Sequence, residues 1–488
     1  MKKFIFSIVI AAGFLLGLPS CSGFLDKVPT DSVVAESAMA TLADAQVVAN
    51  GLYTGLKYYT VYGTNIPYMG DLRGDNLYPV NNSGSGATIY KFGYESIQST
   101  YFTMWQYYYI TLNKANSLIE NIQTLEVESS EDIATKNDIL GQAYAVRALC
   151  HFDIARLYGY PYLKDNGASW GAVIAKEVLS PSEARVPRST VAETYTAVEE
   201  DIALALPLLS KEKNNGHFNY WAGKMLQARV ALYKGDWSTA YSASTEVISQ
   251  SPYRLVPTSE YLAYWGVEGD LESVLELIVT NTGDIDSDGG FYTIYHDMWF
   301  EDKGAGSDII PTKKWRSLFE NTPNDVRAQW IQYDDPNGPY KQTGEYWLKK
   351  FIGNKDRGYT FRRNNPRVFR ITEAYLIAAE AALELGKQSD ADNYLHDVRY
   401  RADNTVTKVA ATLDLIQEER QKEFIGEGHR FFDVMRRGGK IVRDLNYDPR
   451  DFAGPQEITW NDYRVVLPIS SSERTIYPEL QQNPQYKD

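Results

Sequence analysis

Two stretches of the chain each have the pattern of a pair of short helices joined by a glycine turn, and this pattern most constrains the fold. The first, WAGKMLQARVALYKGDWSTAYSASTEVISQSP at residues 221–252, is divided at Lys234-Gly235-Asp236. The second, ITEAYLIAAEAALELGKQSDADNYLHDVRYRA at residues 371–402, turns at Gly386-Lys387. Small residues stand where the paired helices would touch: Ala228, Ala231, Ala240 and Ala243, then Ala378, Ala379, Ala382 and Ala391. A tetratricopeptide repeat is a helical hairpin of about 34 residues, so the sequence predicts a tetratricopeptide-like scaffold.

Helical periodicity also appears outside these hairpins. It starts near Leu42, recurs at residues 101–125, and is strongest from Asn137 to Tyr158. A further helix opens at Ser189 or Thr190, with Glu193 in position to complete a capping box. We therefore expect helical repeats at about residues 40–60, 100–250 and 371–437.

The region between the two hairpins, at about residues 253–370, has a different composition. It is rich in Gly, Asp, Asn, Trp and Tyr and has little helical period. Residues 444–488 are also irregular. The predicted fold is thus mostly α, a helical-repeat scaffold with an irregular insertion rich in loops and strands. An insertion of this length in a compact domain is usually functional.

The N-terminus has the pattern of an exported lipoprotein. Lys2 and Lys3 precede an apolar run, residues 4–18, that is too short to span a bilayer, and Cys21 follows Leu18-Pro19-Ser20. We expect residues 1–20 to be a signal peptide, Cys21 to be lipidated, residues 21–34 to be a tether, and residues 35–488 to be one domain. Pro19 departs from the usual small residue, and a cleaved signal that leaves a free Cys21 is the alternative.

Net charge and cysteine count limit the functions that the chain can have. The net charge of −14, with no basic cluster, argues against nucleic-acid binding. The chain has 2 Cys. If Cys21 carries lipid, neither an intrachain disulfide nor a cysteine metal site can form, and Cys150 is expected to be a buried small hydrophobe in a helix.

The segment ERQKEFIGEGHRFFDVMRRG, residues 419–438, places one of the chain's few His residues among charges. A zinc motif would need H-E-x-x-H or a second nearby His, and neither is present. Arg430, Arg436 and Arg437 would oppose a bound cation. We therefore expect Glu423, Glu427 and His429 to belong to a carboxylate and arginine network that ties a turn to a helix.

Positive evidence for metal or catalytic chemistry is weak. Asp284, Asp286 and Asp288 match the front half of a calcium loop, but Tyr295 occupies the twelfth position, where an EF-hand needs Glu. A looser Ca²⁺ loop is an alternative to a solvated acidic turn. No Walker or dinucleotide motif occurs, and no cofactor is expected.

Aromatic residues in the insertion are the main functional signal. Rings stack on the apolar faces of sugars, while Asn, Asp and Arg hydrogen-bond the hydroxyls. The alternative is that these rings pack the insertion against the scaffold. The candidates are Phe291, Tyr292, Tyr295, Trp299, Trp265 and Trp315 in the insertion, and Arg73, Asp75, Asn76 and Tyr78 in the early loop.

An ordered set of segments resembles one family. These are CSGFLDKVPT, GQAYAVRALCHFDIARLYGYPY, VPRSTVAETY, LQARVALYKGDW, EAYLIAAEAAL, the segment around His429, and the ending QNPQY, where Gln485 replaces the family's Gly. Together they resemble the SusD/RagB family of nutrient-binding outer-membrane lipoproteins of Bacteroidetes, from Cys21 to Tyr486.

The resemblance implies a non-enzymatic, surface-exposed lipoprotein of the outer membrane. Such proteins have a tetratricopeptide-like fold, bind a nutrient and cap a TonB-dependent transporter of the SusC/RagA type. By position it suggests ligand contacts at Arg73, Asn76, Tyr292, Tyr295 and Trp299. An oligosaccharide is the expected ligand and an oligopeptide the alternative. Two other classes stay open, namely a lipid-anchored glycan hydrolase and a helical-repeat adaptor for other proteins.

Overall fold

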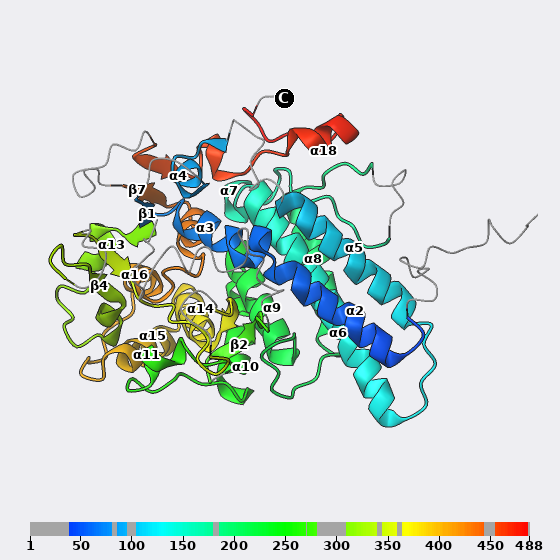
Figure 1. Ribbon diagram of the computed structural model, residues 1–488, viewed down its shortest axis with the longest axis horizontal. Coiled ribbons are helices and arrows are strands. Elements are labelled where there is room, and N and C mark those ends of the chain that lie inside the picture. Colours follow the sequence, from blue (N-terminus) through cyan, green and yellow to red (C-terminus); the bar gives the residue numbers. More distant parts are fainter. Residues whose placement is uncertain are drawn as a thin grey trace, which may run out of the picture.

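In the computed structural model shown in Figure 1, the helices at residues 42–57, 104–122, 130–158 and 191–205 lie on one side of the molecule, and the strands at residues 77–79, 331–333 and 440–442 lie on the other. The structure describes residues 39–80, 85–94, 104–178, 185–269, 271–280, 309–338, 344–358, 364–443 and 454–486. Within these ranges no helix combines the length and apolar character needed to cross a bilayer. The predicted signal peptide and lipidation at Cys21 lie outside the described residues.

Four helices form the first half of the helical frame, and each packs on the next. They are α2 (Leu42–Lys57), α5 (Met104–Ile122), α6 (Ser130–Tyr158) and α8 (Val191–Ala205). The capping box predicted for the last of these is present, with Thr190 and Glu193 satisfying each other's backbone N–H groups. Helix α6 begins before the expected Asn137, because the Ser129 side chain caps it by accepting from the Asp132 N–H.

The two predicted hairpins form the second half of the frame. The first is α9 (Tyr220–Lys234) with α10 (Trp237–Gln250), and the second is α14 (Ile371–Glu384) with α15 (Gln388–Ala402). Gly235 and Gly386 make the turns with φ of 77° and 71°, a left-handed conformation that favours glycine. Helix α10 packs on α14, so the hairpins stack although the insertion separates them in sequence. This stacking confirms a tetratricopeptide-like scaffold.

Short elements complete the structure. The described strands form four two-stranded antiparallel sheets: β1 (Leu77–Pro79) with β3 (Ile309–Pro311), β2 (Ser273–Glu276) with β6 (Arg367–Arg370), β4 (Ile331–Tyr333) with β5 (Tyr346–Leu348), and β7 (Lys440–Val442) with β8 (Glu457–Thr459). The short α-helices are α3 (Asn65–Asp71), α4 (Ser85–Tyr90), α7 (Tyr162–Asp165), α11 (Tyr261–Tyr264), α13 (Lys313–Ser317), α16 (Leu413–Glu423), α17 (Arg430–Arg436) and α18 (Ser471–Ile476). A π-helical turn, Tyr59–Gly63, and two 3₁₀ turns, Val326–Trp330 and Tyr463–Val465, join them.

Trp265 and Trp315, which the sequence placed among the exposed aromatic residues, lie in the core. Trp265 packs edge-on against Trp330, with ring centroids 5.9 Å apart, and both rings are buried. Trp315 is buried as well, and its Nε1–H donates to the Gln421 carbonyl at 2.9 Å. These two rings pack the insertion against the scaffold, so their assignment to an exposed surface is wrong. Cys150 is buried in α6, as expected.

Candidate functional site

The early loop and the insertion meet directly, although 237 positions separate the residues that join them. Strand β1 pairs with β3, so that Tyr78 stands opposite Ile310. Beyond the ladder, Thr312 donates its backbone N–H to the Asn76 carbonyl and its hydroxyl to the Asp75 carbonyl, both at 2.8 Å. The two regions from which the sequence drew its ligand candidates therefore form one joined surface.

Asp75 fixes this joint by ion pairing on two sides. Its Oδ1 lies 2.6 Å from Arg430 Nε in α17, and its Oδ2 lies 2.7 Å from Lys314 Nζ in α13. Burial alone would raise the pKa of Asp75, but the two cations outweigh burial and hold the pKa at about 2. The carboxylate is therefore charged at neutral pH and links the early loop, the insertion and the frame.

A pair of tyrosines and an arginine form an exposed platform beside this joint. Tyr333 of β4 and Tyr346 of β5 are directly opposite in the ladder, with ring centroids 4.9 Å apart. The Arg316 guanidinium of α13 lies 3.8 Å from the Tyr346 ring centroid, an arrangement typical of a cation–π contact. Tyr333 is 43 % exposed. We call Arg316, Tyr333 and Tyr346 the tyrosine platform.

Tyr78 lies close enough to the platform for its hydroxyl to act electrostatically on Arg316. Partial burial lowers the pKa of Arg316, and the hydroxyls of Tyr346 and Tyr78 oppose that shift. The arginine stays charged, so it offers N–H donors beside an exposed ring. Stacking surface and hydrogen-bond donors side by side suit a ligand with apolar faces and hydroxyl edges, as a sugar has.

The structure places the early-loop candidates mainly in the interior. Arg73 is buried, donates through Nη2 to the Val465 carbonyl at 3.1 Å, and stacks 3.7 Å from the Phe431 ring centroid. Asn76 is buried and accepts from Gln421 Nε2 at 2.7 Å. Tyr78 is 7 % exposed. This burial speaks against ligand contact by Arg73 and Asn76, because their polar groups hold the early loop to the frame.

The remaining candidates in the insertion lie outside the described residues. They are Tyr292, Tyr295 and Trp299 for the ligand, and Asp284, Asp286 and Asp288 for Ca²⁺. Their roles stay predictions. Across the part of the chain that the structure describes, no group of three His, Cys, Asp or Glu side chains is arranged to hold a metal ion.

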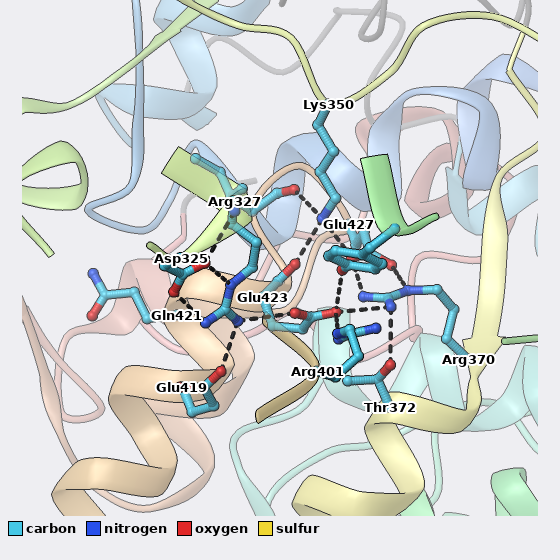
Figure 2. A network of polar contacts seen from close by, with 12 residues as sticks. Asp325, Arg327, Lys350, Arg370, Thr372, Arg401, Glu419, Gln421, Glu423 and Glu427 are labelled. Carbon is cyan, nitrogen blue, oxygen red and sulfur yellow. Dashed lines mark hydrogen bonds and ion pairs between the residues drawn. The ribbon is translucent and has the colours of Figure 1, made fainter. Parts of the chain in front are cut away.

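A buried ion network holds the insertion to the frame (Figure 2). Glu423, the last residue of α16, is at its centre. Its carboxylate accepts from Arg327 Nη1 at 3.0 Å, from Arg370 Nη1 at 2.9 Å and from Arg401 Nη2 at 2.9 Å. Arg327 and Arg370 belong to the insertion and Arg401 to α15. One carboxylate therefore connects three segments that are distant in sequence.

Glu427 extends the network along the turn that follows α16. Arg370 donates to it through Nε at 2.8 Å and through Nη2 at 2.7 Å. Lys350 Nζ donates to Glu427 at 2.7 Å and to the carbonyls of Glu423 and Ile425 at 2.7 and 2.9 Å. A fully buried charge persists only when it is paired in this way.

The pKa shifts in the network follow from burial and charge pairing. Burial would raise the pKa of Glu423, but the charges of Arg401, Arg370 and Arg327 outweigh it and hold the pKa well below its usual range. Burial lowers the pKa of Lys350 to about 8, although Glu427 opposes the shift. The network is thus charged near neutral pH, and all of its described groups serve to join segments.

His429 takes part in this region as a packed ring. It stacks on Phe424, with ring centroids 4.4 Å apart and 23° between planes. Burial and the nearby Arg229 and Arg420 hold the pKa of His429 well below its usual range, so the ring is neutral. The carboxylate and arginine network predicted for residues 419–438 is confirmed for Glu423 and Glu427, whereas His429 packs beside it as a neutral ring.

Sequence reasoning missed the tyrosine platform. Arg316, Tyr333 and Tyr346 stand in unremarkable stretches, KKWRS, IQY and YWL, and only the β4–β5 pairing brings the two rings together. The signal that could have found them is the pair of short aromatic runs on either side of a polar, Gly-containing turn, which is typical of a β-hairpin.

Comparison with known proteins gives matches along nearly the whole chain. The model of the SusD family matches residues 281–486, and a model described as starch-binding associating with outer membrane matches residues 23–232. A SusD-like protein of Formosa agariphila is 24 % identical, with 97 % of each chain covered.

Two solved structures are more similar in sequence and agree in fold. A SusD superfamily protein from Bacteroides thetaiotaomicron is 32 % identical, with a TM-score of 0.83 over 91 % of this chain and 100 % of that one. A protein from Bacteroides vulgatus, described as a putative sugar binding protein, is 30 % identical, with a TM-score of 0.82 over 92 % of this chain and 100 % of that one. Both share the helical frame described above.

Proposed function

The chain belongs to the SusD family, and from this membership we propose that it is a lipid-anchored protein of the outer-membrane surface that binds an oligosaccharide. It passes the ligand to a TonB-dependent transporter of the SusC/RagA type and carries out no chemistry on it. Support for a glycan comes from the sugar-binding description of the Bacteroides vulgatus relative and from the starch-binding description of the matching family model. The Cys21 anchor follows from the sequence pattern of the N-terminus.

The observation that carries the ligand class is the tyrosine platform. An exposed ring, Tyr333, lies against a second ring, Tyr346, which in turn packs on a guanidinium. Rings bind the C–H faces of a sugar at little entropic cost because they have few rotatable bonds, and Arg316 supplies donors for its hydroxyls. Arg327 and Lys350 of the ion network flank β4 and β5 in sequence, so the network anchors the strand pair that carries the platform. A binding surface held in place before ligand arrives lowers the cost of binding.

The test is titration calorimetry of the mature protein with a panel of oligosaccharides, for wild type, Tyr333→Ala and Arg316→Ala. We expect each variant to lose about tenfold or more in affinity, or about 1.4 kcal/mol, for the oligosaccharide that wild type binds. Tyr400→Ala is the matched control, because Tyr400 is 50 % exposed on α15 and lies outside the platform. Unchanged affinity in both platform variants would remove the site assignment.

Assays on the same purified protein distinguish two alternative functions from glycan binding. An oligopeptide ligand would give calorimetric heats with peptides and none with glycans. A lipid-anchored glycan hydrolase would release reducing sugar from polysaccharide over time, whereas a binding protein leaves the polysaccharide intact. The lipid anchor is tested by Cys21→Ser, which should release the protein from the outer-membrane fraction.

A further inference from the structure

Arg316 of the tyrosine platform is a cation without an anionic partner in the described part of the protein. No carboxylate of the described residues forms an ion pair with its guanidinium, and its Nε is enclosed without a hydrogen-bond acceptor. The side chain as a whole is partly buried. Buried arginines elsewhere in the insertion are compensated, since Arg327 lies 2.8 Å from Asp325 and Arg370 lies 2.9 Å from Glu272. Arg316 therefore differs from them as a partly desolvated charge that the fold leaves uncompensated.

The acidic residues near the platform do not neutralise Arg316. Asp75 is already paired with two other cations. Glu320 stands four residues further along the chain, and no ion pair joins it to Arg316 among the described residues. Asp334 and Glu345 directly follow and precede the platform tyrosines, and the Asp334 N–H donates to the Glu345 carbonyl at 2.8 Å. Because side chains alternate along paired strands, these two carboxylates lie on the face opposite the tyrosine rings.

Helix α13 is basic and has no carboxylate of its own. Its sequence, KKWRS, holds Lys313, Lys314 and Arg316 within five residues. The whole chain has a net charge of −14, so a basic element beside an exposed ring is a local exception. A partly buried cation has lost part of its hydration, and a bound anion restores a strong interaction. The electrostatics of the platform therefore favour a negatively charged group on the ligand.

We propose, resting on the function proposed above, that the oligosaccharide bound at the tyrosine platform is acidic, and that Arg316 selects it by pairing with a carboxylate or sulfate ester of the sugar. The Tyr346 ring contacts both the guanidinium, at 3.8 Å, and the Tyr333 ring, at 4.9 Å between centroids. An acidic substituent on a sugar stacked on Tyr333, or on the next sugar, is thus within reach of Arg316. A guanidinium pairs with carboxylates and tetrahedral oxyanions through two parallel N–H donors, which a lysine cannot do.

The test compares charged oligosaccharides with neutral counterparts of the same backbone by titration calorimetry. The probes are oligomers of galacturonate, mannuronate and glucuronate, each against its methyl ester, and κ-carrageenan oligosaccharides against their desulfated form. We expect wild type to bind an acidic probe at least tenfold more tightly than its neutral counterpart, and less tightly as salt rises. The pair that responds distinguishes a carboxylate from a sulfate. If neutral oligosaccharides bind as tightly as acidic ones or more tightly, this inference falls and the proposed function stands; if no oligosaccharide binds, both fall.

Two substitutions of Arg316 separate its charge from its shape. Arg316→Gln keeps N–H donors without charge, and it should raise the Kd for the acidic probe at least tenfold while changing that for the neutral counterpart less than twofold. Arg316→Lys keeps the charge without the paired donors and should fall between wild type and Arg316→Gln. Arg254→Gln is the matched control, because it removes the same charge from an exposed arginine outside the platform. Equal losses for the acidic and the neutral probe in Arg316→Gln would overturn the proposal.

Thermal unfolding without ligand tests whether Arg316 is already neutralised within the protein. Arg316→Gln should unfold near the wild-type temperature, because no ion pair is lost. Arg327→Gln should unfold at a much lower temperature, because Arg327 is buried between Asp325 and Glu423. A loss in Arg316→Gln as large as that in Arg327→Gln would show that a carboxylate of the protein holds Arg316, and the proposal would be wrong.

Discussion

Arg229 and Glu373 form a buried, bidentate ion pair that joins the two stacked hairpins across 144 positions of sequence. Arg229 Nε lies 2.7 Å from Oε1 of Glu373, and Nη2 lies 2.5 Å from Oε2. The guanidinium also donates to the carbonyl of Val368 in β6 at 2.6 Å. This pair therefore fixes α9, α14 and the end of the insertion relative to one another, and the insertion carries the tyrosine platform.

Removing one partner of this pair should be strongly destabilising. The Arg229 and Glu373 side chains are 4 % and 2 % exposed. Glu373→Ala leaves the guanidinium buried without its carboxylate, so we expect a loss of about 3–5 kcal/mol in the free energy of unfolding, measured by urea titration. Glu457→Ala is the control, because it breaks the exposed Lys440–Glu457 pair and should cost at most about 1 kcal/mol. Equal losses of unfolding free energy in the two variants would contradict a strongly stabilising role for the buried pair.

The joint between early loop and insertion should respond to acid through Asp75. The pKa of Asp75 is about 2 in the folded protein, compared with 3.8 for an aspartate without these ion pairs. The ion pairs therefore stabilise the fold fully above pH 3.8, and this stabilisation is lost as the pH falls through about 2. Asp75→Asn should lower the free energy of unfolding by about 2 kcal/mol at pH 7. The difference from wild type should shrink below pH 4. A difference that stays constant from pH 7 to pH 2 would exclude this linkage.

Asp71 should make the free energy of unfolding depend on pH in the opposite direction, so that stability falls as pH rises. It is buried, and burial raises its pKa from 3.8 to about 7, although its Oδ2 accepts from the Gly428 N–H at 2.7 Å. The folded state therefore holds a proton that the unfolded state has released, and stability falls as pH rises from about 4 to about 7. Asp71→Asn keeps an acceptor for Gly428 and cannot ionise. We expect the stability of wild type relative to this variant to fall by up to about 4 kcal/mol over that range, measured by urea titration at each pH.

The sequence predicted those parts of the fold that local patterns determine. Alanines at helical spacing and glycine turns at Gly235 and Gly386 located both hairpins, because a close helix contact and a left-handed turn each restrict the residue type. The same holds for the cap at Thr190. For residues 419–438, crowded arginines were enough to favour a structural network over a cation site.

Contacts between residues that are far apart in sequence could not be predicted. The partners of Glu423 come from residues 327, 370 and 401, and no local pattern marks them. Burial of an aromatic or polar side chain is likewise a property of the assembled fold. Trp265, Trp315, Arg73 and Asn76 have the residue types of a sugar site, yet each fills an interior position. The tyrosine platform was missed for the same reason, because it exists only once β4 and β5 pair.

A close backbone approach between α3 and the turn after α16 gives the last prediction. A Cβ at Gly70 would lie 1.9 Å from the Gly428 carbonyl oxygen, a backbone atom that cannot move aside without shifting the turn that carries Glu427. Gly70→Ala should therefore destabilise the protein by several kcal/mol, on the order of other severe overpacking. It should also weaken oligosaccharide binding, because this turn holds Arg370 and Lys350 of the insertion.

Gly51→Ala in α2 is the matched control, since a Cβ there meets no atom within 4 Å. That substitution should raise the free energy of unfolding by about 0.5–1 kcal/mol, because alanine loses less backbone entropy in a helix than glycine. If urea titration gave Gly70→Ala the stability of Gly51→Ala, the contact between α3 and the turn would not be part of the native packing.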